Sequence, residues 1–118
     1  MAKQADPICE AFEVAIDVLG RPWTGLILGL LQNGPLRFNE LREGGRGVGD
    51  KVLSARLKEL EARGLVIREV DAGPPVKVLY SLTPKGQAFG RVKDAIERWG
   101  RELMAEEKPR ARKGRQSD

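Results

Sequence analysis

Residues 50–82 decide the fold, and they read DKVLSARLKELEARGLVIREVDAGPPVKVLYSL. The first part of this stretch predicts a helix over about 50–63, because Leu53, Leu57 and Leu60 recur at i, i+4 and i+7 on one face. Arg56 lies on one flank of that helix. The opposite face carries small and basic side chains, namely Lys51, Ser54, Ala55 and Lys58. The stretch therefore predicts an amphipathic helix with a basic outer face.

The second part of the stretch predicts a β-hairpin. Residues 65–70 and 76–82 alternate in polarity and are rich in β-branched side chains, as half-buried strands are. Residues 71–75, DAGPP, supply the turn between them. A hairpin that directly follows a basic amphipathic helix predicts a wing beside a DNA-reading helix.

Three further helices are expected ahead of this stretch, over about 7–19, 22–33 and 37–43. Pro7 and Pro22 suit the first turns of the first two, and Asp6 suits the N-cap before Pro7. Phe38 and Leu41 are the expected inward residues of the third, and glycine-rich residues 44–49 connect it to the next helix. Two short helices joined by a turn and followed by a hairpin make a winged helix-turn-helix, a mainly α fold with a two-stranded β-hairpin wing.

The C-terminal segment predicts a dimerisation helix. Thr83-Pro84 provides an N-cap and a first helical residue, and the helix is expected to run to about residue 106. Apolar residues are spaced 3, 4, 3, 4 along it, which is the seam of a coiled coil: Phe89, Val92, Ile96, Trp99 and Leu103. Phe12 and Ile16 on the doubly apolar first helix are expected to join this interface. Residues 1–107 then form one domain, and residues 108–118 a basic, disordered tail.

The net charge of the whole chain is weak evidence for DNA binding, whereas the local charge of residues 37–58 favours it. The net charge of +4 comes from the tail, with five basic residues and one acidic residue at 108–118, so residues 1–107 are neutral overall. Residues 37–58, in contrast, carry a local charge of +3. The predicted DNA contacts place the helix over 50–63 in the major groove and the wing, about 68–78, beside the backbone or minor groove. They are Arg37, Arg42, Arg46, Lys51, Ser54, Ala55, Arg56, Lys58, Arg68 and Lys77. Arg56 has the alternative of bonding a backbone group or pairing with Glu59 or Glu40.

The same residues resemble a known family. The motifs DVLGRPWT at 17–24, RFNEL at 37–41, KVLSARLKEL at 51–60 and YSLTP at 80–84 occur in the order found in HxlR-type regulators, a branch near the MarR family. GP at 34–35, GLV at 64–66 and WG at 99–100 extend the resemblance to about residues 7–100. The resemblance implies a homodimeric winged-helix transcription regulator that binds a pseudo-palindromic operator near the genes it controls.

Three departures from the family pattern affect specific expectations. The order Pro7-Ile8-Cys9 displaces the cysteine of the usual Cys-Pro pair, Val48-Gly49 replaces an Ile-Ser pair, and the hairpin is one residue longer than usual. Some family members use an N-terminal cysteine as a redox sensor, which makes Cys9 a candidate sensor here. The alternative is that Cys9 is a small buried apolar residue, and its acidic neighbours Asp6 and Glu10 favour that alternative because they disfavour the thiolate.

Other classes of protein are poorly supported. The chain has no histidine, no zinc-ligand spacing and no nucleophile motif, so we expect neither an enzyme nor a bound metal or cofactor. It has no long apolar run and no apolar leader, so we expect a cytoplasmic protein without a membrane span. Phe12, Trp23 and Trp99 either line a pocket for a small-molecule effector or pack in the core and dimer interface. The alternative function is a winged-helix module that binds protein and not DNA.

Overall fold

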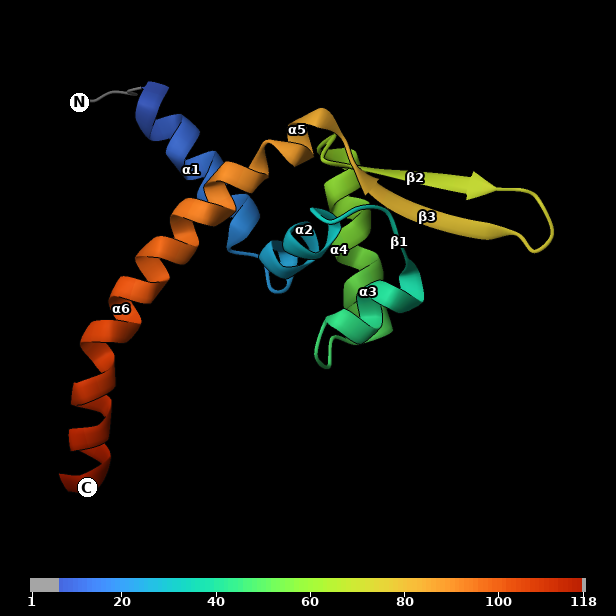
Figure 1. The fold of residues 1–118 in the computed structure, drawn as a ribbon. Coiled ribbons are helices and arrows are strands. Elements are labelled where there is room, and N and C mark those ends of the chain that lie inside the picture. The colour runs from blue at the N-terminus through green and yellow to red at the C-terminus, as the bar shows by residue number, and fades with distance from the viewer. Residues whose placement is uncertain (1–6, 118) are drawn as a thin grey trace. The chain divides into compact units, whose positions relative to one another are not determined.

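The computed structural model describes residues 7–117, with side chains from Cys9 to Ala105 (Figure 1). The chain divides into two compact units, Met1–Gln87 and Ala88–Asp118, and each is described by itself. The first unit holds five helices and a small sheet within the described residues, and the second holds one helix. Asp6, the expected N-cap of the first helix, lies outside the described residues.

Four helices of the first unit correspond to the predicted ones. They are α1 (Pro7–Leu19), α2 (Thr24–Leu31), α3 (Phe38–Gly44) and α4 (Asp50–Ala62). The predicted start of the second helix at Pro22 is wrong, because Trp23 adopts a left-handed conformation with φ of 73° and the helix begins only at Thr24. Gly49 is the N-cap of α4 and Gly64, with φ of 75°, lies just past its end.

The sheet has three strands, so the prediction of a two-stranded hairpin is incomplete. The antiparallel order is β1 (Leu36–Arg37), β3 (Lys77–Leu82), β2 (Val66–Asp71). β2 and β3 form the expected hairpin, with Val66 opposite Leu82 and Asp71 opposite Lys77. β1 adds Leu36 opposite Tyr80, which fastens the start of α3 to the base of the wing.

The core of the first unit lies where the leucine pattern of α4 predicts it. Leu53, Leu57 and Leu60 are at most 2% exposed, and they are buried with Leu41 of α3 and Ile27 of α2. Phe38, the other expected inward residue of α3, is half-buried. The leucine face of α4 is therefore held in the core, and the other side chains of the helix point away from it.

A short helix, α5 (Pro84–Gln87), closes the base of the hairpin. Thr83 is its N-cap as predicted, since the Thr83 hydroxyl accepts a hydrogen bond from the Gly86 N–H at 3.0 Å. That hydroxyl also donates to the Gly64 carbonyl at 2.6 Å, and the Thr83 N–H donates to the Leu65 carbonyl at 3.1 Å. Gly86 is required here, because a Cβ on it would lie 2.1 Å from the Leu65 carbonyl oxygen.

The second unit is the long helix α6 (Phe89–Ser117). The prediction of one continuous helix from residue 84 to about 106 is therefore wrong, because the chain leaves the helix at Ala88 and α6 extends beyond residue 106. Lys93 and Glu97 pair at 2.8 Å one turn apart; their hydrogen bond raises the pKa of Lys93 and lowers the pKa of Glu97. The structure assigns residues 108–117 of the predicted tail to α6, and the side chains of this tail lie outside the described residues.

Among the described residues, no single helix is both long and apolar enough to cross a bilayer. The α1 and α2 segments reach the necessary length and composition only when taken together, and they meet at an angle of 87°.

Candidate nucleic-acid interface

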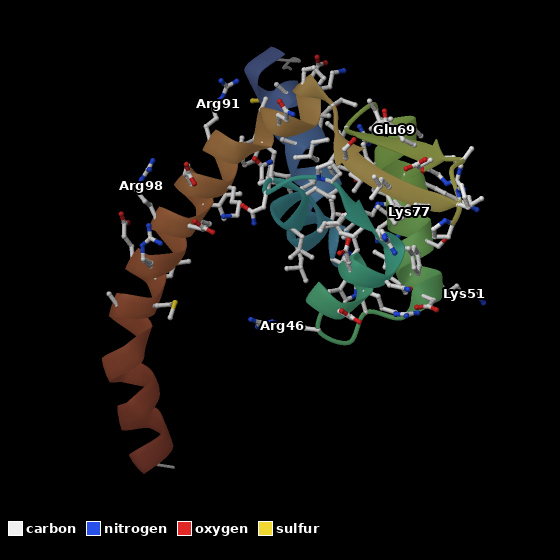
Figure 2. The ribbon with its side chains drawn as sticks, turned by 45° about the vertical axis from the view of Figure 1, so that its right-hand side comes forward. Arg46, Lys51, Glu69, Lys77, Arg91 and Arg98 are labelled. Carbon is white, nitrogen blue, oxygen red and sulfur yellow. The ribbon has the colours of Figure 1, made fainter. Side chains whose placement is uncertain are left out.

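Helix α4 presents three distinct faces. The leucine face is buried, and the second face carries Lys51, Ser54, Ala55 and Lys58, which are exposed except for the half-buried Ser54. These four residues are spaced i, i+3, i+4 and i+7, so they form one stripe along the helix. Figure 2 shows Lys51 at the outer end of this helix, directed away from the body of the first unit. An exposed basic stripe on a helix with a fully buried opposite face is the shape that a major groove admits.

The cations around the start of α4 come from α3 and the turn that follows it. Arg46 is exposed, adopts a left-handed φ of 54° and points outward in Figure 2. Arg42 is engaged within the unit, since its Nη1 donates to both carboxylate oxygens of Asp50 at 3.0 Å and its Nη2 to Asn39 at 3.1 Å. The ion pair of Arg42 and Asp50 therefore joins α3 to the first turn of α4, a link that the sequence pattern does not reveal.

Arg37 is exposed at the junction of β1 and α3. It is the N-cap residue of α3, and its backbone N–H donates to the Glu40 carboxylate at 2.8 Å. Glu40 is thus occupied in capping the helix, and its predicted alternative as a partner of Arg56 is not realised.

The two wing cations lie on opposite faces of the sheet. Arg68 pairs in register with Tyr80, whereas Lys77 lies opposite Asp71 at the outer end of the hairpin. Successive side chains in a strand alternate between faces, so Arg68 shares a face with Val66, and Lys77 shares the other with Glu69. The wing therefore offers one cation on each face, near acidic side chains on the Lys77 face.

Arg56 differs from the other predicted DNA contacts. Its side chain is only 16% exposed, and it belongs to the third face of α4, which is turned toward the corner between α1 and α2. Its Nε donates to the Pro22 carbonyl at 2.9 Å and its Nη1 to Glu59 at 3.1 Å. The structure thus realises the alternative of a backbone bond and a Glu59 pair.

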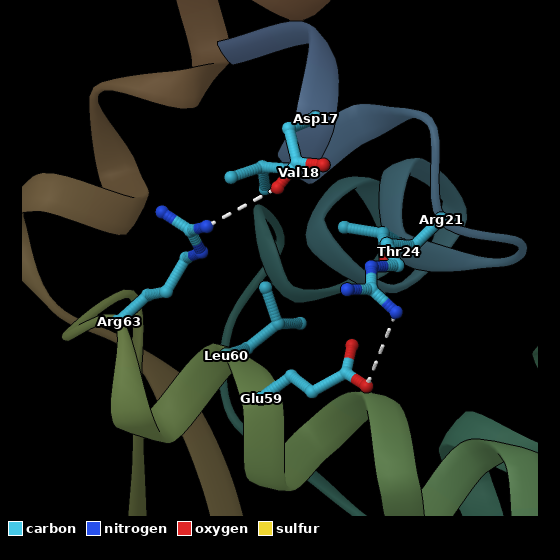
Figure 3. Close-up of a pocket in the computed structure, with 7 residues that line it drawn as sticks. All are labelled: Asp17, Val18, Arg21, Thr24, Glu59, Leu60 and Arg63. Atoms are coloured by element: carbon cyan, nitrogen blue, oxygen red, sulfur yellow. Dashed lines mark hydrogen bonds and ion pairs between the residues drawn. The ribbon is translucent and has the colours of Figure 1, made fainter. Parts of the chain in front are cut away.

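A cavity of about 110 Å³ lies between this third face and the ends of α1 and α2 (Figure 3). Arg63 reaches Asp17 at 3.3 Å and Arg21 reaches Glu59 at 3.9 Å across it. The charged side chains that line the cavity pair with each other, so they hold α4 against the ends of α1 and α2 and are not free to bind a ligand. None of the aromatic residues considered for an effector pocket, Phe12, Trp23 and Trp99, lines it.

Apolar side chains are exposed on a helix of each unit. On α1, Phe12 is 66% and Ile16 is 50% exposed. On α6, the predicted seam is exposed from Val92 to Leu103, with Trp99 at 62% and Ile96 at 43%. Phe89 is half-buried, and Val92 and Leu103 are exposed. Exposed apolar surface of this kind is typical of interaction sites.

Cys9 is a free, exposed cysteine on the first turns of α1. The alternative reading of a buried apolar residue does not hold within this chain. Within the part of the chain that the structure describes, no group of three or more His, Cys, Asp and Glu side chains could hold a metal ion.

Comparison with known proteins decides the family. A family model described as HxlR-like helix-turn-helix matches residues 18–108. The chain belongs to the HxlR-like helix-turn-helix family. Two relatives, both from Bacillus subtilis, are each 42% identical to this HxlR-like chain. The uncharacterized HTH-type transcriptional regulator YvaP matches over 82% of this chain and 90% of its own length. The HTH-type transcriptional regulator YodB matches over 78% of this chain and 82% of its own length.

Solved structures agree with this assignment. The reduced form of YodB from B. subtilis matches the HxlR-like chain with a TM-score of 0.73 and 41% identity, covering 81% of this chain and 91% of that one. The redox regulator HypR in its oxidized form matches with a TM-score of 0.71 and 36% identity, covering 78% and 95%. A structure named as a transcriptional regulator of the MarR family from Enterococcus faecalis V583 matches with a TM-score of 0.77 and 32% identity, covering 92% of this chain and 97% of that one. The winged helix-turn-helix fold is thereby confirmed, and the relatives are named as transcriptional regulators and not as enzymes.

Proposed function

We propose that this protein controls transcription as a homodimer that binds a pseudo-palindromic operator. Helix α4 enters the major groove, and the wing at about 68–78 lies beside the backbone or minor groove. The observation that carries the proposal is the division of α4 into a fully buried leucine face and an exposed stripe with Lys51 and Lys58. In bacteria and archaea the chromosome lies in the cytoplasm, so we infer a cytoplasmic location from this function.

The predicted DNA contacts differ in whether their side chains are exposed or engaged within the unit. The stripe of α4 would lie in the major groove, where Ser54 and Ala55 would meet base edges and Lys51 and Lys58 would contact base edges or the flanking phosphates. Arg37, Arg46, Arg68 and Lys77 would contact phosphates. Arg42 contributes mainly through its pair with Asp50, which fixes the first turn of α4. Arg56 is left out of the contact set because its donors are engaged inside the unit.

Two copies are needed to read a two-fold symmetric site. The apolar seam of α6, with Phe12 and Ile16 of α1, supplies surface that a second copy would cover. Two α4 helices in one dimer would then contact half-sites about one helical turn of DNA apart.

The proposal is tested by the salt dependence of duplex binding. We expect the wild-type chain to bind a duplex selected from a random pool, and the affinity to fall at least ~10⁴-fold between ~50 and ~200 mM salt, as release of counterions from about eight or more phosphates requires. A chain ending at Glu107 serves as the control for the basic tail, which either adds nonspecific affinity or is only a solubilising end. A truncated chain that selects no duplex would favour the alternative of a protein-binding module.

Redox control through Cys9 is a second candidate role. The thiol is exposed, and the compared structures include YodB in reduced and diamide-treated forms and HypR as a redox regulator. This chain has one cysteine, so diamide can produce only a disulfide between two chains or with a small thiol, as it is itself reduced to the hydrazine. We expect diamide to give a linked dimer on a non-reducing gel and to change duplex binding in the wild type, and to do neither in Cys9→Ser. Duplex binding by the wild type that is unchanged by diamide would exclude Cys9 as a redox sensor for this function.

A further inference from the structure

The third face of α4 is engaged with the corner that joins α1 to α2. This face carries Arg56, Glu59 and Arg63 at i, i+3 and i+7. Arg63 reaches Asp17 near the end of α1, and Glu59 reaches Arg21 in the corner. Arg56 makes the closest of these contacts, from its Nε to the Pro22 carbonyl at 2.9 Å. The side chains that meet at this joint are drawn in Figure 3, apart from Arg56 itself.

The Pro22 carbonyl is an acceptor that the backbone leaves free. Trp23 adopts a φ of 73° immediately after it, and α2 begins only at Thr24. Within the described residues, the backbone bonds at this corner use the Arg21 and Trp23 carbonyls, and none uses the Pro22 carbonyl. A left-handed Trp is a strained conformation that persists only where surrounding contacts hold it. The bond from Arg56 is such a contact.

The placement of Arg56 determines which motion of α4 it restrains. The leucine face fixes how deeply α4 sits in the unit. The hydrogen bond from Arg56 adds a directional restraint on rotation of the helix about its own axis, because such a bond weakens steeply when its angle changes. Arg56 lies to the side of both the leucine face and the lysine stripe. At a radius of about 6 Å, a rotation of only ~10° moves the outer side chains by about 1 Å, which is enough to spoil paired hydrogen bonds to a base edge.

We propose that Arg56 is a positioning residue for DNA recognition, one that holds the rotation of α4 by its bond to the Pro22 carbonyl without touching DNA. The inference rests on the proposed function. Arg56 then acts as a support for α4 and not as the DNA contact expected from the sequence. The corner between α1 and α2 takes part in DNA recognition because it holds α4 in place. Glu59 supports Arg56 by accepting from its Nη1 at 3.1 Å, while it also faces Arg21 at 3.9 Å.

The test compares three variants of the full chain: Arg56→Met, Arg56→Lys and, as a matched control on the same helix, Lys58→Met. Each is titrated with the selected duplex and with random duplex at several salt concentrations. We expect Arg56→Met to weaken binding to the selected duplex about tenfold, with an unchanged slope of log affinity against log salt. Arg56→Lys is expected to recover part of that loss, because its ammonium group can still donate to the Pro22 carbonyl. Lys58→Met is expected to flatten the slope by about 0.9 for each subunit that loses a phosphate contact.

A second measurement does not depend on DNA. Amide hydrogen exchange over residues 20–27 is expected to accelerate in Arg56→Met and to stay at the wild-type rate in Lys58→Met, with β2 and β3 protected equally in both. A salt slope that falls in Arg56→Met as it does in Lys58→Met would overturn the proposal, as would unchanged affinity together with unchanged exchange. Failure of the wild type to bind any duplex would instead overturn the proposed function itself, and the positioning role with it.

Discussion

Replacing Ile96 and Trp99 together by glutamate is expected to convert the protein to a monomer and to lower its affinity for the selected duplex at least a hundredfold. Both side chains lie on the uncovered seam of α6, where Trp99 is 62% exposed. Covering about 150 Å² of one Trp contributes about 4 kcal/mol to association, whereas a carboxylate buried there without a partner opposes it. A monomer also loses the second half-site, which in the dimer binds at a high effective concentration.

The control is Ala105→Glu, which introduces a single glutamate on the opposite side of α6, at an exposed position, and so tests whether a carboxylate on this helix is by itself disruptive. Sedimentation velocity at micromolar concentration measures the oligomeric state, and gel-shift titration measures the affinity. A double variant that stays dimeric would move the interface away from this seam. A monomer with full affinity for the duplex would remove the requirement for two copies.

Neutralising Lys51 and Lys58 together, as the double variant Lys51→Gln and Lys58→Gln, is expected to weaken binding to the selected duplex about a hundredfold. Both ammonium groups are exposed on the stripe of α4, so their removal leaves the core of the unit unchanged. The loss corresponds to about 3 kcal/mol, within what two base or phosphate contacts per subunit supply. Four charges are removed from a dimer, so the slope of log affinity against log salt should flatten by up to about 3.6.

A variant with the same loss of charge elsewhere, Lys85→Gln with Arg91→Gln, tests whether the effect is local. Both positions are exposed and lie outside the proposed interface. The control should change the slope little, and thermal unfolding of both double variants should match the wild type. Equal weakening by the two pairs would mean that overall charge, and not α4, determines binding.

The sequence predicts those parts of the fold that depend on local periodicity. Leu53, Leu57 and Leu60 gave the orientation of α4, and Thr83 gave the start of α5, because each acts through residues within a few positions. β1 could not be predicted in this way. It is two residues long, and its partners Leu79 and Tyr80 lie more than 40 positions away, so it has no local pattern.

The candidate site shows the same division. The exposure of Lys51 and Lys58 follows from the helix period alone. The role of Arg56 depends on a carbonyl 34 positions earlier, which is available only because Trp23 adopts a left-handed conformation. A bulky aromatic residue gives no sequence signal for that conformation, as a glycine would. The break at Ala88 has no sequence signal of this kind, because the expected seam begins only at Phe89 and its spacing says nothing about the residues before it.

Because Thr83 bonds to Gly64 and Leu65, the length of the wing can change without changing the position of α4. They fasten the two ends of the β2–β3 ribbon at its root, next to the last turn of α4. An inserted or deleted residue at the tip, around 72–76, is absorbed beyond that fastening, in exposed chain. Evolution can therefore change the length of the hairpin, and with it the stretch of duplex within reach of the wing, without changing how α4 is held in the unit.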